Sequence, residues 1–311
     1  MSDIARQPLM LFAGVDPGSE SYAFSIINEV GNQVSYFEIP TQSIPHYSLS
    51  AVRRLLDYKP YCIALPSGHG LPLVRGNQLN DEYIALLTLS KSKEGPLHSI
   101  LNAFRFMIIN SFTIPSVVEI ESVPIYRKIW IDMGTADKVA SAFFYRAYLS
   151  LSDFVLLEMG RHFSSIMVVK DGKIIDGFGG TVIPGLASPG AIDGEVVYLL
   201  NKAGISVDKE TIYSGSNEER SIEILEMISS SLAHKYDSKI IVSGPAKDKI
   251  SIGEKMNLPF KEAAIGSAMI ASGICGYAYR DYIDMLKSNG NPVSFMRLKG
   301  WDEVVSWIKT L

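Results

Sequence analysis

The residues best suited to chemistry stand in short glycine-bearing segments that follow apolar runs. The first is Asp16–Ser19 (DPGS), which separates the apolar runs Leu9–Val15 and Tyr22–Asn28. A tight turn of Gly and Ser presents main-chain N–H groups and a hydroxyl that can bind phosphate, and Asp16 can hold Mg²⁺ directly or through water. The same residue types also form ordinary acidic β-turns. The segment therefore indicates a phosphate site only in combination with others of its kind.

Two further segments of this kind lie in the second half of the chain. Gly177–Thr181 (GFGGT) follows a predicted hairpin, and Ser243–Pro245 (SGP) follows a predicted strand over Lys239–Val242. Asp193 stands at the start of a predicted helix, where a carboxylate is usually an N-cap but could also hold Mg²⁺. Three glycine-bearing loops at strand ends together favour a nucleotide cleft between two domains.

Lys138 is the cation whose position most suggests a ligand. It lies in the first turn of a predicted helix over Thr135–Leu151, where a positive charge is unfavourable against the helix dipole. A phosphate nearby would explain it. Arg127 and Lys128 are further candidates, although such side chains are mostly solvated surface charges. Asp132, just before the helix, could act as a catalytic base or support the helix electrostatically.

A candidate acceptor site follows the predicted strand Tyr61–Leu65. It is the segment Ser67–Gly70 (SGHG), in which His69 stands between two glycines. Histidine ordinarily titrates near neutrality and could act on a substrate here. The alternative is that His69 is an ordinary histidine of a surface turn. A carboxylate acceptor is already ionised at pH 7 and needs no general base. A hydroxyl acceptor needs one, and Asp132, Asp193 or His69 could serve.

The elements that must position these residues occur twice. Strand-like runs at Leu9–Val15, Tyr22–Asn28 and Gln33–Ile39 form hairpins after Asp16. A second series begins at Phe154–Glu158, followed by Gly160 and a hairpin whose turn is Lys170–Lys173. A strand that ends in an acid and a glycine, followed by a hairpin, therefore appears twice, which predicts a twofold α/β architecture.

Composition excludes several classes of function. The chain has 311 residues, with 29 Lys and Arg against 33 Asp and Glu, which gives a formal net charge of −4. A nucleic-acid or anionic-membrane binder needs a basic field, so neither is expected. Cys62 and Cys275 are too few and too far apart for a disulfide framework or a zinc site. No signal peptide or membrane span is expected, and we predict a cytoplasmic protein.

At this level the sequence resembles the actin-like ATPase superfamily, which includes acetate kinases, sugar kinases, heat-shock ATPases and actin. Asp16–Ser19 is similar to its first phosphate motif, Glu158–Gly160 stands where its second would be, and Ile241–Gly244 resembles its adenosine motif. The nearest resemblance is to an archaeal family identified as predicted butyrate kinases. The stretches that carry it are Gly14–Tyr22, Leu65–Gly68, Arg127–Lys128, Asp132–Lys138, Lys170–Thr181 and Ala191–Glu195.

The resemblance implies two ribonuclease-H-like α/β domains of duplicated type with a nucleotide cleft between them, over residues 1–133 and 134–276, and a helical tail over 277–311. It implies ATP and Mg²⁺ as cofactors and a small-molecule substrate. A homodimer is compatible with the resemblance. On this reading Asp16 and Asp193 bind Mg²⁺, and Gly244 contacts the adenosine. The residues expected to bind phosphate are Gly18, Ser19, Gly160, Gly179, Gly180 and Thr181. Arg127 and Lys138 steady the acceptor or the transferred phosphoryl, Asp132 is a further catalytic candidate, and Ser67 and His69 contact the substrate.

The implied activity is phosphoryl transfer to a short-chain carboxylic acid, as in a butyrate kinase. Two alternatives stay open. One is a kinase with a hydroxyl acceptor, such as a sugar. The other is a nucleotide-binding regulator or assembly partner with little catalysis, which the bulky Arg161–Phe163 after Gly160 would suit.

Overall fold

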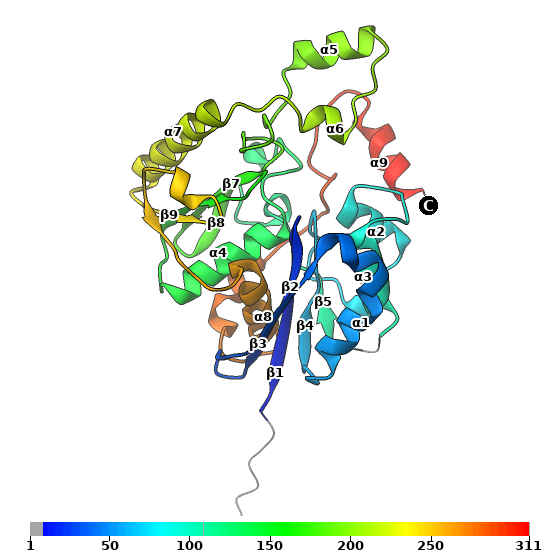
Figure 1. The fold of residues 1–311 in the computed structure, drawn as a ribbon, viewed down its shortest axis with the longest axis vertical. Helices are drawn as coiled ribbons and strands as arrows, with labels where there is room; N and C mark the ends of the chain where they lie inside the picture. Colours follow the sequence, from blue (N-terminus) through cyan, green and yellow to red (C-terminus); the bar gives the residue numbers. More distant parts are fainter. Residues whose placement is uncertain (1–8, 108, 311) are drawn as a thin grey trace, which may run out of the picture.

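The computed structural model describes residues 9–107 and 109–310, which form two five-stranded mixed sheets (Figure 1). The first sheet has the order β3-β2-β1-β4-β5, with β1 Leu11–Pro17, β2 Ser21–Asn28, β3 Gln33–Pro40, β4 Cys62–Ala64 and β5 Ser111–Phe112. The second has the order β8-β7-β6-β9-β10, with β6 Phe154–Met159, β7 Ser164–Lys170, β8 Lys173–Phe178, β9 Lys239–Ser243 and β10 Glu254–Lys255.

The two sheets repeat one topology. In each, the first three strands form two antiparallel hairpins, and the fourth and fifth strands add in parallel beside the first. Each second hairpin also has a register irregularity, at Ile26/Ile27 and at Val168/Val169. The predicted twofold α/β architecture is confirmed.

The β7–β8 turn shows how local sequence produces these hairpins. Asp171 and Gly172 both adopt left-handed backbone angles, with φ of 50° and 68°. Two consecutive positive φ values are typical of the tight hairpin turn that matches strand twist. Asp tolerates this conformation and Gly adopts it freely.

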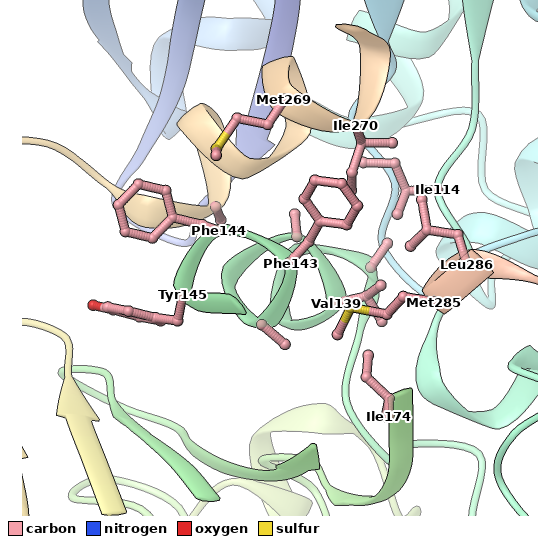
Figure 2. Close-up of a cluster of buried hydrophobic side chains, with 14 of the residues drawn as sticks. Ile114, Val139, Phe143, Phe144, Tyr145, Ile174, Met269, Ile270, Met285 and Leu286 are labelled. Carbon is pink, nitrogen blue, oxygen red and sulfur yellow. The ribbon is translucent and has the colours of Figure 1, made fainter. Parts of the chain in front are cut away.

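Helices cover the outer faces and fill the space between the sheets. Their bounds are α1 Ile44–Leu56, α2 Asp81–Thr88, α3 Pro96–Arg105, α4 Ala136–Tyr148, α5 Gly194–Lys202, α6 Lys209–Ile212, α7 Glu218–Tyr236, α8 Glu262–Ile274 and α9 Trp301–Lys309. Helices α1 and α3 pack on the first sheet and α7 on the second. Helices α4 and α8 pack on each other in the centre, where their apolar side chains form the largest buried cluster (Figure 2).

Helix α8 follows the second sheet in sequence but packs against β1, β2 and β4 of the first. Helix α8 approaches β1 and α4 closely, because small residues lie where the elements meet. A Cβ atom on Gly266 would lie 2.0 Å from the carbonyl oxygen of Ala140 in α4, and one on Gly14 would lie 2.2 Å from the main-chain nitrogen of Ala268. These contacts fix the two halves of the chain relative to each other; the domain limits predicted above stay a prediction.

Gly266→Ala is expected to lower the free energy of unfolding by about 1–3 kcal/mol, because the added methyl group would overlap main-chain atoms of α4 that cannot move aside. The matched control is Gly194→Ala at the start of α5, where a Cβ atom would meet nothing within 4 Å. That change should be neutral or slightly stabilising. Urea unfolding of both variants measures the difference, and equal stability would contradict the close α4–α8 contact.

Several segments form 3₁₀ turns rather than a regular helix or strand. Val117–Glu119 is a short 3₁₀ turn, because the main-chain N–H of Ser116 donates to the Glu119 carboxylate at 2.6 Å and closes a capping box. In the tail, Arg280–Leu286 is also 3₁₀, whereas α9 is a helix as predicted and packs on α2. Over the described residues, none of the helices combines the length and apolarity that a membrane crossing requires.

Candidate active site

A cavity of about 420 Å³ lies between the two halves of the chain. Residues at the ends of β1 and β6 line it, together with the turns that follow these strands and the starts of α4 and α8. Most of the residues singled out in the sequence meet here. They are Asp16, Gly18, Ser19, Ser67, His69, Asp132, Lys138, Gly160, Gly179, Gly180, Thr181 and Gly244.

Asp16 is the most perturbed acid of the cavity. It is the next-to-last residue of β1 and only 5% exposed. Burial, and then repulsion from Asp137, raise the pKa of its carboxyl to about 7, although Lys261 and Lys138 act in the opposite direction. The Lys261 ammonium lies 4.0 Å from Asp16, at the limit of an ion pair, and compensates the carboxylate only in part. A divalent cation at this point would displace the proton.

Lys138 is held between two acids beside Asp16. Its ammonium lies 2.6 Å from Asp137 and 2.5 Å from Glu158. Burial acts to lower the pKa of Lys138, but the two acids outweigh it and hold the pKa well above its ordinary value. The pKa of Asp137 is lowered in turn, because attraction by Lys138 outweighs the opposing effect of burial. Asp137, Lys138 and Glu158 thus form one partly buried ionic cluster, with side chains 19%, 24% and 17% exposed, called the acid–lysine cluster below.

The first hairpin turn and the acid–lysine cluster face the cavity with free donors and a free acceptor. The main-chain N–H groups of Ser19 and Glu20, after β1, have no acceptor among the described residues. In the acid–lysine cluster, the second carboxylate oxygen of Glu158 is buried with no hydrogen-bond partner there. Free N–H groups suit an anion, and an unpartnered carboxylate oxygen suits a cation.

These donors and acceptors fit a nucleotide with Mg²⁺. Over residues 9–107 and 109–310, no three His, Cys, Asp or Glu side chains gather closely enough to hold a metal by themselves. Mg²⁺ does not need such a cage, because it usually binds through one or two carboxylates, water and the phosphates of its ligand. Asp16 and Glu158 are the carboxylates available for this here.

The loop Gly177–Thr181 differs from the expectation. The carboxylate of Asp132 accepts hydrogen bonds from the Thr181 N–H at 2.9 Å and from the Thr181 hydroxyl at 2.8 Å. A Cβ atom on Gly179 would lie 1.7 Å from the same carboxylate, so the glycine makes room for Asp132. An internal carboxylate therefore accepts from the donors that we expected to bind phosphate, and the roles predicted for Thr181 and Asp132 stay predictions.

Gly160 and Gly180 both lie against Phe163. The Gly160 N–H donates to the Phe163 carbonyl at 3.0 Å, and a Cβ atom on Gly180 would meet the Phe163 side chain at 2.6 Å. Phe163, in the turn between β6 and β7, is therefore held by Gly160 of the same turn and by Gly180 after β8. Phe163 packs edge-to-face on Tyr213, which also lines the cavity.

The structure does not bring Arg127 or Asp193 to the cavity. The Arg127 guanidinium pairs with Asp176 at 3.3 Å and donates to the Tyr236 hydroxyl at 2.7 Å, which ties β8 to the end of α7. Asp193 is the N-cap of α5 and accepts from the Glu195 N–H at 2.8 Å. Neither residue lines the cavity, so the function proposed below does not use the predicted acceptor contact of Arg127 or the predicted Mg²⁺ role of Asp193. Lys128 also lies elsewhere, over the ring of Phe295.

His69 also lines the cavity. Burial lowers its pKa, so the ring is neutral at pH 7, and Nδ1 is buried with no hydrogen-bond partner among the described residues. Ser67 is less free, because its hydroxyl accepts from the Ile114 N–H at 3.2 Å and lies 3.3 Å from the Leu65 carbonyl.

Sequence reasoning missed several lining residues. Lys261 is the most important, because its ammonium donates to the Ser21 carbonyl and hydroxyl at 2.7 Å each and so ties the start of α8 to the first hairpin. Glu158 was placed in the expected second phosphate motif but was assigned no role of its own. It is the next-to-last residue of β6, as Asp16 is of β1, and it lines the cavity.

Comparison with known proteins shows the family and the fold. Residues 14–298 match the family described as "Protein of unknown function (DUF1464)", and the chain belongs to that family. A search of the curated proteins found no match. An acetate kinase from Entamoeba histolytica superposes with a TM-score of 0.53 at 10% identity, covering 76% of this chain and 82% of that one. The chain therefore has the two-domain fold of the actin-like ATPases, as expected.

Other solved structures are similar at lower scores. A ROK family glucokinase from Streptomyces griseus, in complex with glucose and AMPPNP, has a TM-score of 0.46 at 13% identity, covering 85% of this chain and 99% of that one. The ethanolamine utilization protein EutJ from Carboxydothermus hydrogenoformans has a TM-score of 0.44 at 13% identity, covering 84% and 90%.

Proposed function

We propose that this member of the DUF1464 family is an ATP- and magnesium-dependent small-molecule kinase that phosphorylates a short-chain carboxylic acid. The observation that carries the proposal is Asp16, a buried carboxyl whose pKa is near 7 and which lies beside the free N–H groups of Ser19 and Glu20. An anion-binding turn next to a carboxylate that is only partly compensated suits a phosphate chain with its metal ion. The acetate kinase fold is consistent with this chemistry but shows the fold alone.

ATP with Mg²⁺ would supply an activated phosphoryl group whose charge the metal partly neutralises. Asp16 and the free oxygen of Glu158 would hold the metal, directly or through water. The N–H groups of the first turn would bind phosphate oxygens, and Gly244 would border the adenosine. Lys138 orients Asp137 and Glu158 and, with Lys261, places positive charge near the site of transfer. Positioning and charge neutralisation of this kind are what phosphoryl transfer needs from a protein.

Acyl-phosphate trapping tests the proposal. Purified protein, ATP and Mg²⁺ are incubated with hydroxylamine and a panel of acids from acetate to valerate. Acid-dependent hydroxamate establishes a carboxylate kinase and ranks its acceptors. If the protein binds ATP but forms hydroxamate with none of the acids, the proposal that the acceptor is a carboxylate is rejected.

A hydroxyl acceptor is the second candidate, and His69 is the observation that favours it. Its neutral ring has an unpartnered Nδ1 in the cavity, where it could accept the proton of an alcohol. Transfer of label from γ-³²P-ATP to a panel of sugars and polyols separates this candidate from the first. ATP binding without transfer to either panel would instead favour the nucleotide-binding regulator.

Glu20→Gln is expected to tighten binding of Mg·ATP by about two- to fivefold. The Glu20 carboxylate lies 3.1 Å from Nε of Arg161, so this pair joins the turn after β1 to the turn after β6 at the rim of the cavity. An exposed pair contributes only about 0.2–1 kcal/mol. Removing the acid frees Arg161 and takes a negative charge away from the path of an anionic ligand.

Isothermal titration calorimetry measures this effect, with Arg161→Gln as the complementary variant. Arg161→Gln should weaken binding, because it leaves Glu20 alone at the rim. Equal affinities of both variants and the parent protein would show that the rim pair has no influence on the ligand.

A further inference from the structure

The segment between Asp193 and Glu210 is a helical arm with an unusually exposed apolar surface. It contains α5 and the start of α6, and no residue of α5 is buried. The exposed fractions are 46% for Val196, 39% for Val197, 55% for Tyr198 and 62% for Leu199, and Ile205 and Val207 beyond the helix are also exposed. In Figure 1, α5 lies outside the layers formed by the two sheets and their helices.

The sequence of α5 is nevertheless that of a packed helix. At 100° per residue, Val196, Leu199, Leu200 and Ala203 fall on one face, and Tyr198 and Asn201 on the opposite face. A nine-residue helix is too short to be stable in water without tertiary packing. The apolar face of α5 therefore needs a partner surface.

We propose that the partner is the same face of α5 in a second copy of this chain, paired antiparallel about a twofold axis. The charges of the helix support this occupant. Glu195 and Lys202 lie on the same flank of the apolar face, in the first and the last turn of the helix, and both are exposed. A twofold axis perpendicular to the helices places Glu195 of each copy beside Lys202 of the other, so the surface is complementary to itself. A parallel pair would not bring these charges together.

The proposed dimer is weak and reversible. The helix is about 13 Å long, and its apolar face is smaller than the roughly 800 Å² that each partner buries in a stable complex. Ile205 and Val207 extend the apolar surface beyond the helix. Because α5 does not line the cavity, a change in association and a change in nucleotide binding are separable by experiment.

Sedimentation velocity of the full chain over a range of concentrations tests the proposal. The parent protein should show a concentration-dependent monomer–dimer equilibrium, and Leu199→Asp should remove it. Tyr198→Asp, on the opposite face of the same helix, is the matched control and should leave the equilibrium unchanged. A monomer at every concentration would overturn the proposal, as would a dimer that persists in Leu199→Asp.

Charge exchange tests the antiparallel geometry, even where Leu199→Asp perturbs the helix itself. Glu195→Lys and Lys202→Glu should each weaken dimerisation on the order of tenfold, because each places like charges together at both ends. An equal mixture of these two variants should form heterodimers, and the double variant Glu195→Lys/Lys202→Glu should dimerise like the parent. Failure of both the mixture and the double variant to associate would overturn the pairing.

Discussion

Asp16→Asn is expected to abolish phosphoryl transfer, with a loss of at least about a thousandfold in turnover, while the protein stays folded. Asparagine keeps the shape of the side chain but cannot neutralise a divalent cation, and metal-assisted charge neutralisation supplies much of the catalysis in phosphoryl transfer. The hydroxamate or labelled-phosphate assay measures the loss. In the parent protein, binding of Mg·ATP should strengthen as pH rises through about 7, because the metal requires the ionised form of Asp16.

The same substitution should stabilise the fold. The pKa of Asp16 is raised from 3.8 to about 7 in the folded protein, mainly by burial, so its ionised form opposes folding. A group of this kind stabilises the fold at low pH and loses that contribution as pH rises through the folded pKa. Asp16→Asn should therefore raise the free energy of unfolding by about 1–4 kcal/mol at pH 8, with a smaller gain at pH 5.

Asp153→Asn is the matched control, because it should change the free energy of unfolding in the opposite direction. The Ser152 hydroxyl and the Asp171 N–H lower the pKa of Asp153 to about 2, so its ionised form favours folding. That variant should lose stability at neutral pH and not at pH 2. A fully active Asp16→Asn, or one destabilised at pH 8, would contradict the role and the environment assigned to Asp16.

Lys138→Met is expected to cost about 2–4 kcal/mol of unfolding free energy. The methionine fills a similar volume but leaves the partly buried Asp137 and Glu158 without their shared cation, and a poorly solvated charge without a partner is destabilising. Nucleotide binding should weaken as well, because Asp137 and Glu158 would then repel the phosphates and each other. Urea unfolding and calorimetry measure the two effects.

Two further variants distinguish the acid–lysine cluster from an ordinary ion pair. Lys93→Met removes an exposed lysine that pairs with Asp81 at 3.0 Å, and it should cost no more than about 1 kcal/mol. The triple variant Lys138→Met/Asp137→Asn/Glu158→Gln should recover part of the stability lost in Lys138→Met, because it removes the unpaired charges. Similar small losses in Lys93→Met and Lys138→Met would mean that the cluster is not a partly buried ionic unit.

The fold was predictable because its signals are local and repeated. Apolar runs ending in Asp16 and Glu158, each followed by a hairpin, are readable within about 30 residues, and the structure repeats them as equivalent strands. The long apolar stripe of α4 is equally local, and its side chains form the central core (Figure 2).

The partners of individual charges were not predictable in the same way. Arg127 pairs with Asp176, and Asp132 binds Thr181, both 49 residues further along the chain. Many acids and donors compete for such contacts, and only the tertiary fold selects among them. The contacts of Lys261 with Ser21, much earlier in the chain, are a further example, because they depend on α8 packing against the first sheet.

Calorimetric titration of Mg·ATP into the parent protein, Asp16→Asn and Asp193→Asn tests the central claim most directly. Asp193 is the matched control, because it caps α5 outside the cavity and asparagine is also a good N-cap. The account predicts a single site in the parent protein, the same affinity in Asp193→Asn and no measurable binding in Asp16→Asn. No binding to the parent protein at millimolar nucleotide, or equal affinity in Asp16→Asn, would contradict a nucleotide site built on Asp16.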